Sequence, residues 1–252
     1  MAVEAAREAL RHADAAPHDI DLVLHASSYF QGYDLWAPAS YVQREAVGNA
    51  CLSLAVEQLS NGGMAALELA VAYLRADASR HSALVTTGDR FCLPGIDRWT
   101  TDPGTVLGDG GTAIVLSTAG GFALIRSLVT VSDPVLEKMG RGDDPFATAP
   151  METRTPISVE EPRARLGKEM GMSELIDRLH TGQPGGFRTG PAGGGCEAGG
   201  PRLDGAPPPR PREDGLPVLL GAGPRPGADH VALGLGGSAI SARATCSPGS
   251  PI

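Results

Sequence analysis

The segment between Cys51 and Leu74 most constrains what this chain can fold into. A short apolar run, Cys51 to Val56, leads through the small-residue turn Ser60-Asn61-Gly62-Gly63 into a stripe of apolar residues at helical spacing: Met64, Leu67, Val71 and Leu74. This order predicts a buried strand, a sharp turn and a helix. Strand–turn–helix units of this kind build α/β folds, in which helices cover the faces of a sheet.

The same alternation of helix and strand signals extends on both sides of that segment. Further helices are predicted at 2–13, 38–48 and 172–179. Further strands are predicted at 20–25, 83–87, 112–117 and 122–131, the last two as a β-pair joined at Gly120-Gly121. The alternation predicts an α/β protein with a largely parallel sheet.

The composition changes near residue 181. Residues 181–252 hold 18 of the 34 glycines and 12 of the 21 prolines, and Phe187 is their only aromatic residue. Glycine and proline interrupt helices and strands, and few large apolar residues remain there to build a core. We therefore expect most of this tail to be loop or disordered.

Charge and cysteine usage exclude several classes of protein. The chain has 252 residues and a net charge of −8, without a basic stripe, so nucleic acid is not an expected partner. No apolar run reaches the roughly 18 residues of a membrane span, and the start, Met1 to Glu4, does not have the pattern of a signal peptide. The four cysteines, Cys51, Cys92, Cys196 and Cys246, are too widely spaced to indicate a metal site or a disulfide scaffold. These features predict a cytoplasmic protein with no bound metal or cofactor.

Ser60 is the strongest candidate for a catalytic residue. The predicted turn places its side chain at the N-terminus of a helix, where the helix dipole and free N–H groups stabilise negative charge. Acyl-transfer enzymes place nucleophiles on such strand-to-helix turns. A serine there can also be a helix cap without chemistry.

Three stretches in order resemble the ketosynthase III family over residues 1 to about 117. Ser60 stands where that family has its reactive cysteine, followed by glycines and a helix. Gly108 to Ala113 resembles the family's glycine-rich turn before a strand, although a purely structural turn also explains it. Asp19 to Leu24, and Trp36 to Ala39, resemble the segments that precede the nucleophile strand. The amino-acid sequence around Ser60 is most similar to that of actinomycete polyketide starter-unit members of the daunorubicin type, which are noted for serine at this position.

The resemblance implies a thiolase-like layered αβαβα fold and a homodimer, or a complex with a ketosynthase partner. It implies transfer of an acyl group from acyl-CoA, a substrate, to Ser60 in polyketide starter-unit selection, and an acyl carrier protein as partner. Asp229 to Ser238 resembles the family's closing strand and glycine loop, so the backbone N–H groups of Ser60 and of Gly236 or Gly237 are the predicted oxyanion hole.

The second half of the chain departs from the family. The family's active site uses a histidine and an asparagine from that half, but the two asparagines here are Asn49 and Asn61, and neither His180 nor His230 has a matching context. We therefore predict an N-terminal half at 1–168 that carries the nucleophile turn. We predict a degraded, incomplete C-terminal half at 169–252, with 183–226 disordered or frame-shifted. A catalytically silent ketosynthase-like partner and a non-functional fragment remain alternative interpretations.

Several other residues have simpler interpretations. Four aromatic residues crowd one loop and predict an acyl pocket or a dimer interface, with the interface favoured: Tyr29, Phe30, Tyr33 and Trp36. The pair Asp89-Arg90 predicts a loop salt bridge or turn, and His25, at the end of a strand, is expected to be structural.

Overall fold

The strands form one mixed sheet. A computed structural model of the chain describes residues 1–121, 123–181, 216–220, 230–233 and 238–246. Its strands form an eight-stranded sheet in the order β2-β1-β3-β4-β6-β5-β8-β7. The strands are β1 (Leu22–Ala26), β2 (Leu52–Val56), β3 (Ser82–Asp89), β4 (Gly110–Ser117), β5 (Ala123–Ser132), β6 (Leu216–Leu220), β7 (His230–Leu233) and β8 (Ser238–Cys246).

Helices and shorter helical turns connect the strands. The α-helices are α1 (Ala2–His12), α2 (Pro38–Val42), α3 (Gly62–Ala76), α4 (Lys138–Arg141), α5 (Glu160–Met170) and α6 (Met172–Thr181). The short turns are η1 (Pro17–Asp19), η2 (Gln43–Val47), η3 (Leu59–Asn61) and η4 (Pro134–Glu137). The predicted helix from residue 38 to 48 is α2 continued by η2, a π-helical turn, and Gly48 ends it at a φ of 75° that glycine adopts without strain.

Only one end of the sheet is parallel. Strand β1 pairs in parallel with both β2 and β3, so that Leu24 lies opposite Leu54 and Val85. All pairs from β3 onward are antiparallel. The prediction of a largely parallel sheet is therefore wrong beyond β3, because β3 reaches β4 through a loop that returns along the same edge instead of a helical crossover.

The predicted β-pair between residues 112 and 131 is also corrected. Strands β4 and β5 are present, but they do not pair with each other, because β6 lies between them and pairs antiparallel with both. Nothing near Gly120-Gly121 signals this insertion, since β6 comes almost a hundred residues later in the chain. Strand β6 falls inside 183–226; the remainder of that segment lies outside the described residues, and its disorder or frame shift stays a prediction.

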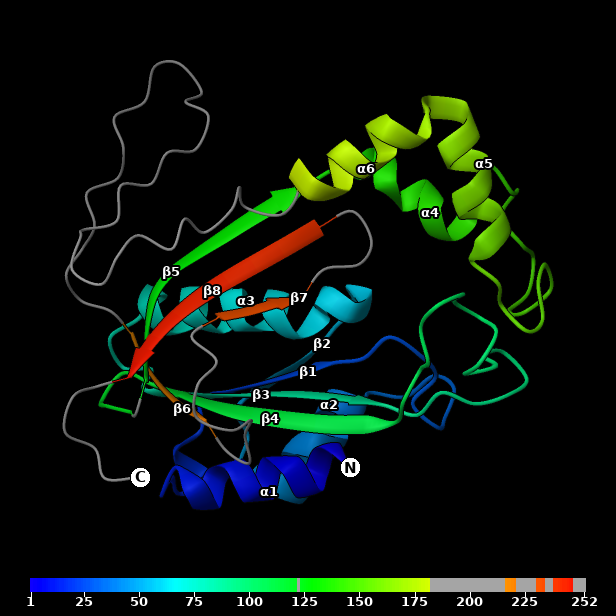
Figure 1. Ribbon diagram of the computed structural model, residues 1–252. Coiled ribbons are helices and arrows are strands. Elements are labelled where there is room, and N and C mark those ends of the chain that lie inside the picture. The colour runs from blue at the N-terminus through cyan, green and yellow to red at the C-terminus, as the bar shows by residue number, and fades with distance from the viewer. Residues whose placement is uncertain (122, 182–215, 221–229, 234–237, 247–252) are drawn as a thin grey trace, which may run out of the picture.

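The elements stack in layers, as Figure 1 shows. Helices α1 and α2 cover one face of the sheet, α1 against β3 and β4 and α2 against β1 and β2, and α3 lies on the opposite face. Strands β5, β8 and β7 pass over the far side of α3, so that one sheet contacts this helix from both sides. The predicted α/β class and layered arrangement are confirmed.

Two apolar cores lie on the two faces of the sheet. Leu24 points toward α3 and packs in the cluster that contains Leu67. The neighbouring Val23 points to the other face and packs in the cluster that contains Leu10 of α1. Because successive strand residues alternate between faces, one short strand serves both cores. Burial of each such side chain contributes about 1.5–3 kcal/mol.

Strand β2 forms an exposed edge of the sheet. The sequence predicts it to be buried, yet Leu52 and Leu54 are 45% and 47% exposed. The prediction is wrong because, within the described residues, β2 has a strand neighbour, β1, on one side only. An apolar edge strand of this kind can pair with another chain.

Residues 134–181 add a helical segment with a small core of its own: Leu136, Leu166 and Leu175. It is tied to the loop after β3 by a salt bridge between Arg163 and Asp102, and by a 3.1 Å hydrogen bond from the Val159 N–H to the Thr101 carbonyl. Helix α6 confirms the prediction at 172–179. The predicted boundary at 168 falls inside α5, and the division into two halves stays a prediction.

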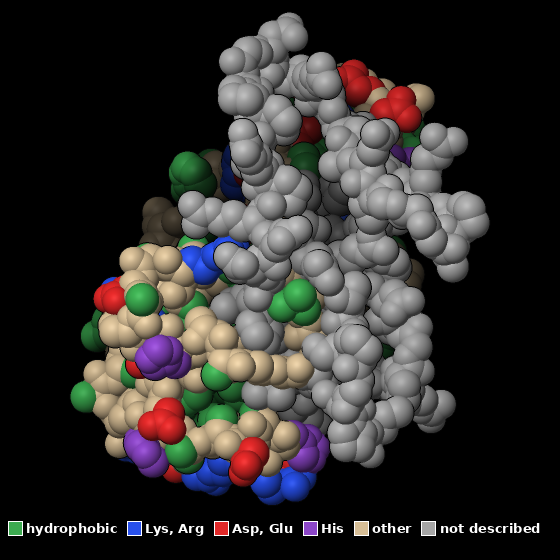
Figure 2. All heavy atoms as spheres, turned by 90° about the vertical axis from the view of Figure 1, so that its left-hand side faces the viewer, with side chains coloured by type: hydrophobic (Ala, Val, Ile, Leu, Met, Phe, Trp, Pro, Cys, Tyr) green, Lys and Arg blue, Asp and Glu red, His purple; other side chains and the backbone are tan. Residues whose placement is uncertain are grey.

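Charged groups are mixed on the face of the molecule that Figure 2 shows. Figure 2 shows acidic, basic and histidine side chains interspersed near the end of the molecule that holds α1. No helix in the described part of the chain is long and apolar enough to cross a membrane.

Candidate active site

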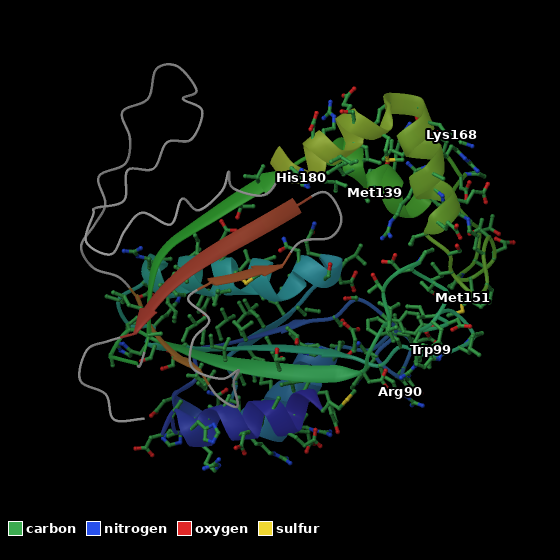
Figure 3. All side chains as sticks on the ribbon, viewed as in Figure 1. Arg90, Trp99, Met139, Met151, Lys168 and His180 are labelled. Carbon is green, nitrogen blue, oxygen red and sulfur yellow. The ribbon has the colours of Figure 1, made fainter. Side chains whose placement is uncertain are left out.

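Three connections meet beyond the carboxyl ends of the parallel strands. The loop 27–37 follows β1, the turn η3 follows β2, and the loop 90–109 follows β3. Ligands of open α/β sheets bind at this edge, because the loops there can vary while the strands hold them in place. Figure 3 shows Arg90 and Trp99 of the third connection at this end of the sheet, below the helical segment.

Ser60 lies on the predicted turn. It is exposed, in the 3₁₀ turn η3 that leads directly into the 15-residue helix α3. The preceding residue, Leu59, has a φ of 48°, a left-handed conformation that costs a leucine on the order of 1–2 kcal/mol. Backbone strain of this kind is concentrated at functional sites. The position of Ser60 thus agrees with the sequence, while its role as acyl acceptor stays a prediction.

Two glycines let α3 begin directly against the sheet. A Cβ atom on Gly62 would lie 3.0 Å from the Cβ of Ala26, at the end of β1. A Cβ atom on Gly63 would lie 3.0 Å from the Cγ2 of Thr87, in β3. Both distances are shorter than ordinary carbon–carbon contacts of about 3.5–4.0 Å. The glycines therefore fix how closely the helix N-terminus, and with it Ser60, approaches the strands.

Asn61 occupies the N-cap position of α3 but does not cap it. Its backbone is helical, its side chain makes no capping hydrogen bond, and the residue is fully buried. Neither Nδ2 nor Oδ1 has a hydrogen-bond partner within the described residues. An asparagine at this position usually accepts a hydrogen bond from the first helical turn. Because the Asn61 side chain points inward, it does not occupy the N–H groups of the first turn of α3. A site that stabilises a developing negative charge needs such N–H groups.

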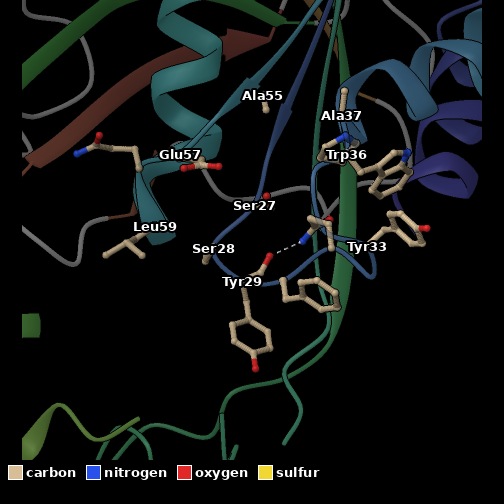
Figure 4. Close-up of a pocket in the computed structure, with 13 residues that line it drawn as sticks. Ser27, Ser28, Tyr29, Tyr33, Trp36, Ala37, Ala55, Glu57 and Leu59 are labelled. Atoms are coloured by element: carbon tan, nitrogen blue, oxygen red, sulfur yellow. Dashed lines mark hydrogen bonds between the residues drawn. The ribbon is translucent and has the colours of Figure 1, made fainter. Parts of the chain in front are cut away.

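A cavity of about 860 Å³ opens next to this turn (Figure 4). Its walls come from the loop after β1, the start of α2 and the end of β2 with η3. Thirteen residues line it: Ser27, Ser28, Tyr29, Phe30, Gln31, Tyr33, Trp36, Ala37, Pro38, Ala55, Glu57, Gln58 and Leu59. All four aromatic residues singled out in the sequence are among them, and the only charged side chain among these residues is that of Glu57.

A buried polar network supports the loop after β1. His25 is 1% exposed, and its Nδ1 and Nε2 lie 2.9 Å from Thr86 Oγ1 and 3.2 Å from Gln31 Oε1. Burial lowers the pKa of His25, so its neutral form is favoured. Because both ring nitrogens are engaged, His25 is not positioned to act as a base toward Ser60, and its structural interpretation agrees with this geometry.

Asp89 does not form the salt bridge that is one of the two predictions for Asp89-Arg90, the other being a turn. Its carboxylate accepts hydrogen bonds from the backbone N–H of Ser28 at 2.9 Å and of Tyr29 at 3.0 Å. Among the described residues, the nearby ion pair joins Arg98 to Asp109, and none joins Asp89 to Arg90. Gln31, which bonds to both His25 and Asp89, was not signalled by the sequence, because a single glutamine in a loop has no distinctive pattern.

Ser60 is not itself among the residues that line the cavity, although its neighbour Leu59 is. Gly236 and Gly237 lie outside the described residues, so the predicted oxyanion hole is not tested. His180 lies in the last turn of α6, in the helical segment (Figure 3), and does not line the cavity. Within the described part of the chain, no cluster of three or more His, Cys, Asp or Glu side chains could hold a metal ion.

Comparison with known proteins points to one group of enzymes. No protein-family model matches the chain. It is 35% identical over 130 residues to the β-ketoacyl-[acyl-carrier-protein] synthase III of Synechococcus sp. (strain WH7803), a match that covers 51% of this chain and 37% of the relative.

Two solved structures extend the similarity. The acyltransferase ChlB3 superposes with a TM-score of 0.65 at 38% identity, over 71% of this chain and 52% of that protein. The priming β-ketosynthase of the R1128 polyketide pathway superposes with a TM-score of 0.53 at 20% identity, over 72% of this chain and 53% of that protein, and shows the fold alone. The chain thus resembles ketosynthase III enzymes and has a thiolase-like fold, and it spans about half the length of these structures, or less in the case of the curated relative.

Proposed function

We propose that this ketosynthase III-like chain transfers an acyl group from acyl-coenzyme A in the selection of a polyketide starter unit, with Ser60 as the acyl acceptor. The observation that carries the proposal is the exposed Ser60 on the turn that leads into α3, directly after Leu59, which lines the cavity of about 860 Å³. The named activities of two similar proteins, a β-ketoacyl synthase and an acyltransferase, support the same chemistry.

The proposed reaction is the transfer of the acyl group from the sulfur of coenzyme A to the Oγ of Ser60. The Oγ of Ser60 attacks the thioester carbonyl carbon, and the carbonyl oxygen becomes an oxyanion. The backbone N–H of Ser60 and that of Gly236 or Gly237 are the donors proposed for this oxyanion; removal of one such donor typically lowers the rate by about 10²–10³. The carbon–sulfur bond then breaks, and coenzyme A leaves with the hydroxyl proton on its sulfur. The acyl group on Ser60 passes next to an acyl carrier protein.

Intact-mass spectrometry tests the acyl acceptor directly. After incubation with acetyl- or propionyl-coenzyme A, the protein is expected to gain one acyl group, and Ser60→Ala is expected to gain none. Ser53→Ala is the matched control, since Ser53 lies in the strand that leads to the turn. An adduct that persists in Ser60→Ala would show that the acyl acceptor is another residue.

The edge strand β2 supports a proposed homodimer or a complex with a ketosynthase. Leu52 and Leu54 expose apolar surface on a strand that lacks a described neighbour on one side. Leu54→Lys is expected to convert the dimer to a monomer in sedimentation-velocity experiments, because a charge on the edge opposes pairing. A wild-type chain that is monomeric at all concentrations would contradict this arrangement.

A second function is favoured by the cavity itself. None of its described lining residues is a histidine, and His25 is fully engaged elsewhere. A serine without a base is a weak nucleophile. We therefore keep a catalytically silent partner that docks on an active ketosynthase as the alternative. Absence of any acyl adduct, together with stable association with a ketosynthase, would favour it.

A further inference from the structure

Gln31 connects the wall of the cavity to the sheet. Its Nε2 donates toward the carbonyls of Tyr29 at 2.9 Å and Gly88 at 3.0 Å, and lies 3.2 Å from Oδ1 of Asp89. Its Oε1 lies 3.2 Å from Nε2 of His25. One side chain therefore bonds to the loop after β1, to the end of β3 and to the interior of β1.

Asp89 fixes the same loop from the other side. Both of its carboxylate oxygens lie 2.9 Å from the Ser28 nitrogen, and Oδ1 also accepts from the Tyr29 nitrogen. The Tyr29 hydroxyl in turn donates to the Cys92 carbonyl at 3.1 Å. Hydrogen bonds to an ionised group are about twice as strong as neutral ones. The backbone of the loop is thus held at successive residues where it lines the cavity.

His25 lies between the amide of Gln31 and the hydroxyl of Thr86. A threonine hydroxyl has a single proton; Thr86 Oγ1 lies 2.9 Å from Nδ1 of His25, where either atom can be the donor, and 3.3 Å from the Leu24 carbonyl, to which it can only donate. If Nδ1 accepts that proton, Nε2 carries the ring proton and donates to Gln31 Oε1. The Gln31 amide group is then directed with its NH₂ toward the loop and Asp89.

We propose that Gln31 is a positioning residue for substrate binding. It holds the aromatic wall of the cavity, formed by Tyr29, Phe30, Tyr33 and Trp36, in the shape that receives the acyl group of the acyl-coenzyme A. This role rests on the proposed function of Ser60. Gln31 contacts no reacting atom in that scheme and acts through Tyr29 and the residues that follow it. Replacement of Gln31 therefore weakens the binding of acyl-coenzyme A, while the rate of acyl transfer to Ser60 in the saturated complex stays the same.

The test compares Gln31→Met with Gln43→Met. Gln43 is a matched control, because its Nε2 also donates to two backbone carbonyls, those of Asn49 at 3.1 Å and Cys51 at 2.6 Å, and it does not line the cavity. Both variants are made in the Ser60→Ala protein, which cannot be acylated in the proposed scheme. Calorimetry with propionyl-coenzyme A is expected to show an affinity about tenfold weaker for Gln31→Met, which corresponds to the loss of one to two hydrogen bonds. The affinity of Gln43→Met is expected to stay within about twofold of the parent. Equal weakening in both variants would overturn the proposal.

Amide hydrogen exchange separates this proposal from the function of Ser60. The Ser28 and Tyr29 amides are expected to exchange at least about tenfold faster in Gln31→Met and at the parent rate in Gln43→Met. Unchanged exchange in Gln31→Met would refute the positioning role whether or not acyl groups bind. If the wild type forms no acyl adduct, the proposed function fails, and amide exchange still decides the role of Gln31. Should Gln31→Met not fold, Tyr29→Phe, which removes only the bond to the Cys92 carbonyl, tests the same wall by the same exchange measurement.

Discussion

The close approach of α3 to β3 gives a prediction that can be worked out in energy. In Gly63→Ala, the new Cβ would lie 3.0 Å from the Cγ2 of Thr87, at least half an ångström inside the usual contact distance of about 3.5–4.0 Å. Overpacking of this kind costs about 1–3 kcal/mol. Alanine regains at most about 1 kcal/mol of helix propensity over glycine. We expect Gly63→Ala to lower the free energy of unfolding by about 1 kcal/mol.

A second substitution removes the clash without disturbing the rest of the site. Thr87→Ser deletes only the Cγ2 methyl and keeps the hydroxyl, which lies 2.8 Å from the hydroxyl of Thr112. In the Thr87→Ser background, Gly63→Ala should no longer destabilise the protein. The expected coupling between the two changes is about 1–2 kcal/mol, within the range seen for residues in contact.

Urea unfolding of the wild type, the two single variants and the double variant measures this coupling. Gly140→Ala is the control for helix propensity, because Gly140 lies in α4 and a Cβ atom there meets nothing within 4 Å. It should leave the stability unchanged or raise it slightly. The reasoning is refuted if Gly63→Ala is as stable as Gly140→Ala, or if the effects of Gly63→Ala and Thr87→Ser simply add.

Three further predictions concern charge and the nucleophile. Asp102→Asn should lower the free energy of unfolding by about 3 kcal/mol, because Arg163 loses its partner at a site where the carboxylate is 11% exposed; Glu161→Gln, which alters an exposed pair, should leave it unchanged. Since burial lowers the pKa of His25, the unfolded chain binds a proton that the folded chain does not, so the stability should decrease as the pH falls below about 6.5, and His25→Gln should flatten that part of the urea-midpoint profile. A profile as steep in His25→Gln as in the wild type would contradict this assignment. Ser60→Cys should form its acyl adduct faster than the wild type, with a rate that rises as the pH approaches about 8.5, as followed by mass spectrometry; a slower reaction would argue against Ser60 as the acyl acceptor.

The sequence predicted those parts of the fold that rest on local patterns. The helical stripe from Met64 to Leu74, the strand ending near His25 and the turn at Ser60 all appear where the apolar spacing places them. Exposure of Leu52 and Leu54 was not predicted, because an apolar run has the same appearance in an edge strand as in a central one.

Long-range pairing and polar contacts account for the rest. The separation of β4 from β5 depends on β6, and no local signal reports such a distant partner. The cavity was anticipated only as a cluster of aromatic residues in one loop. The hydrogen bonds of Gln31 and Asp89 link segments more than fifty residues apart, so they emerge only when β1 and β3 lie side by side.

The position of α3 between two parts of one sheet has a kinetic consequence. The strands that position the turn, β2, β1 and β3, all lie between residues 22 and 89, whereas β8, which passes over the other side of α3, begins at Ser238. Chains fold from the N-terminus as they leave the ribosome, and contacts between distant segments form slowly. The turn that carries Ser60 can therefore assemble long before β8, which lies over the other side of α3, is synthesised. During that interval the outer side of α3 is a surface that chaperones, or a second copy of the chain, would meet first.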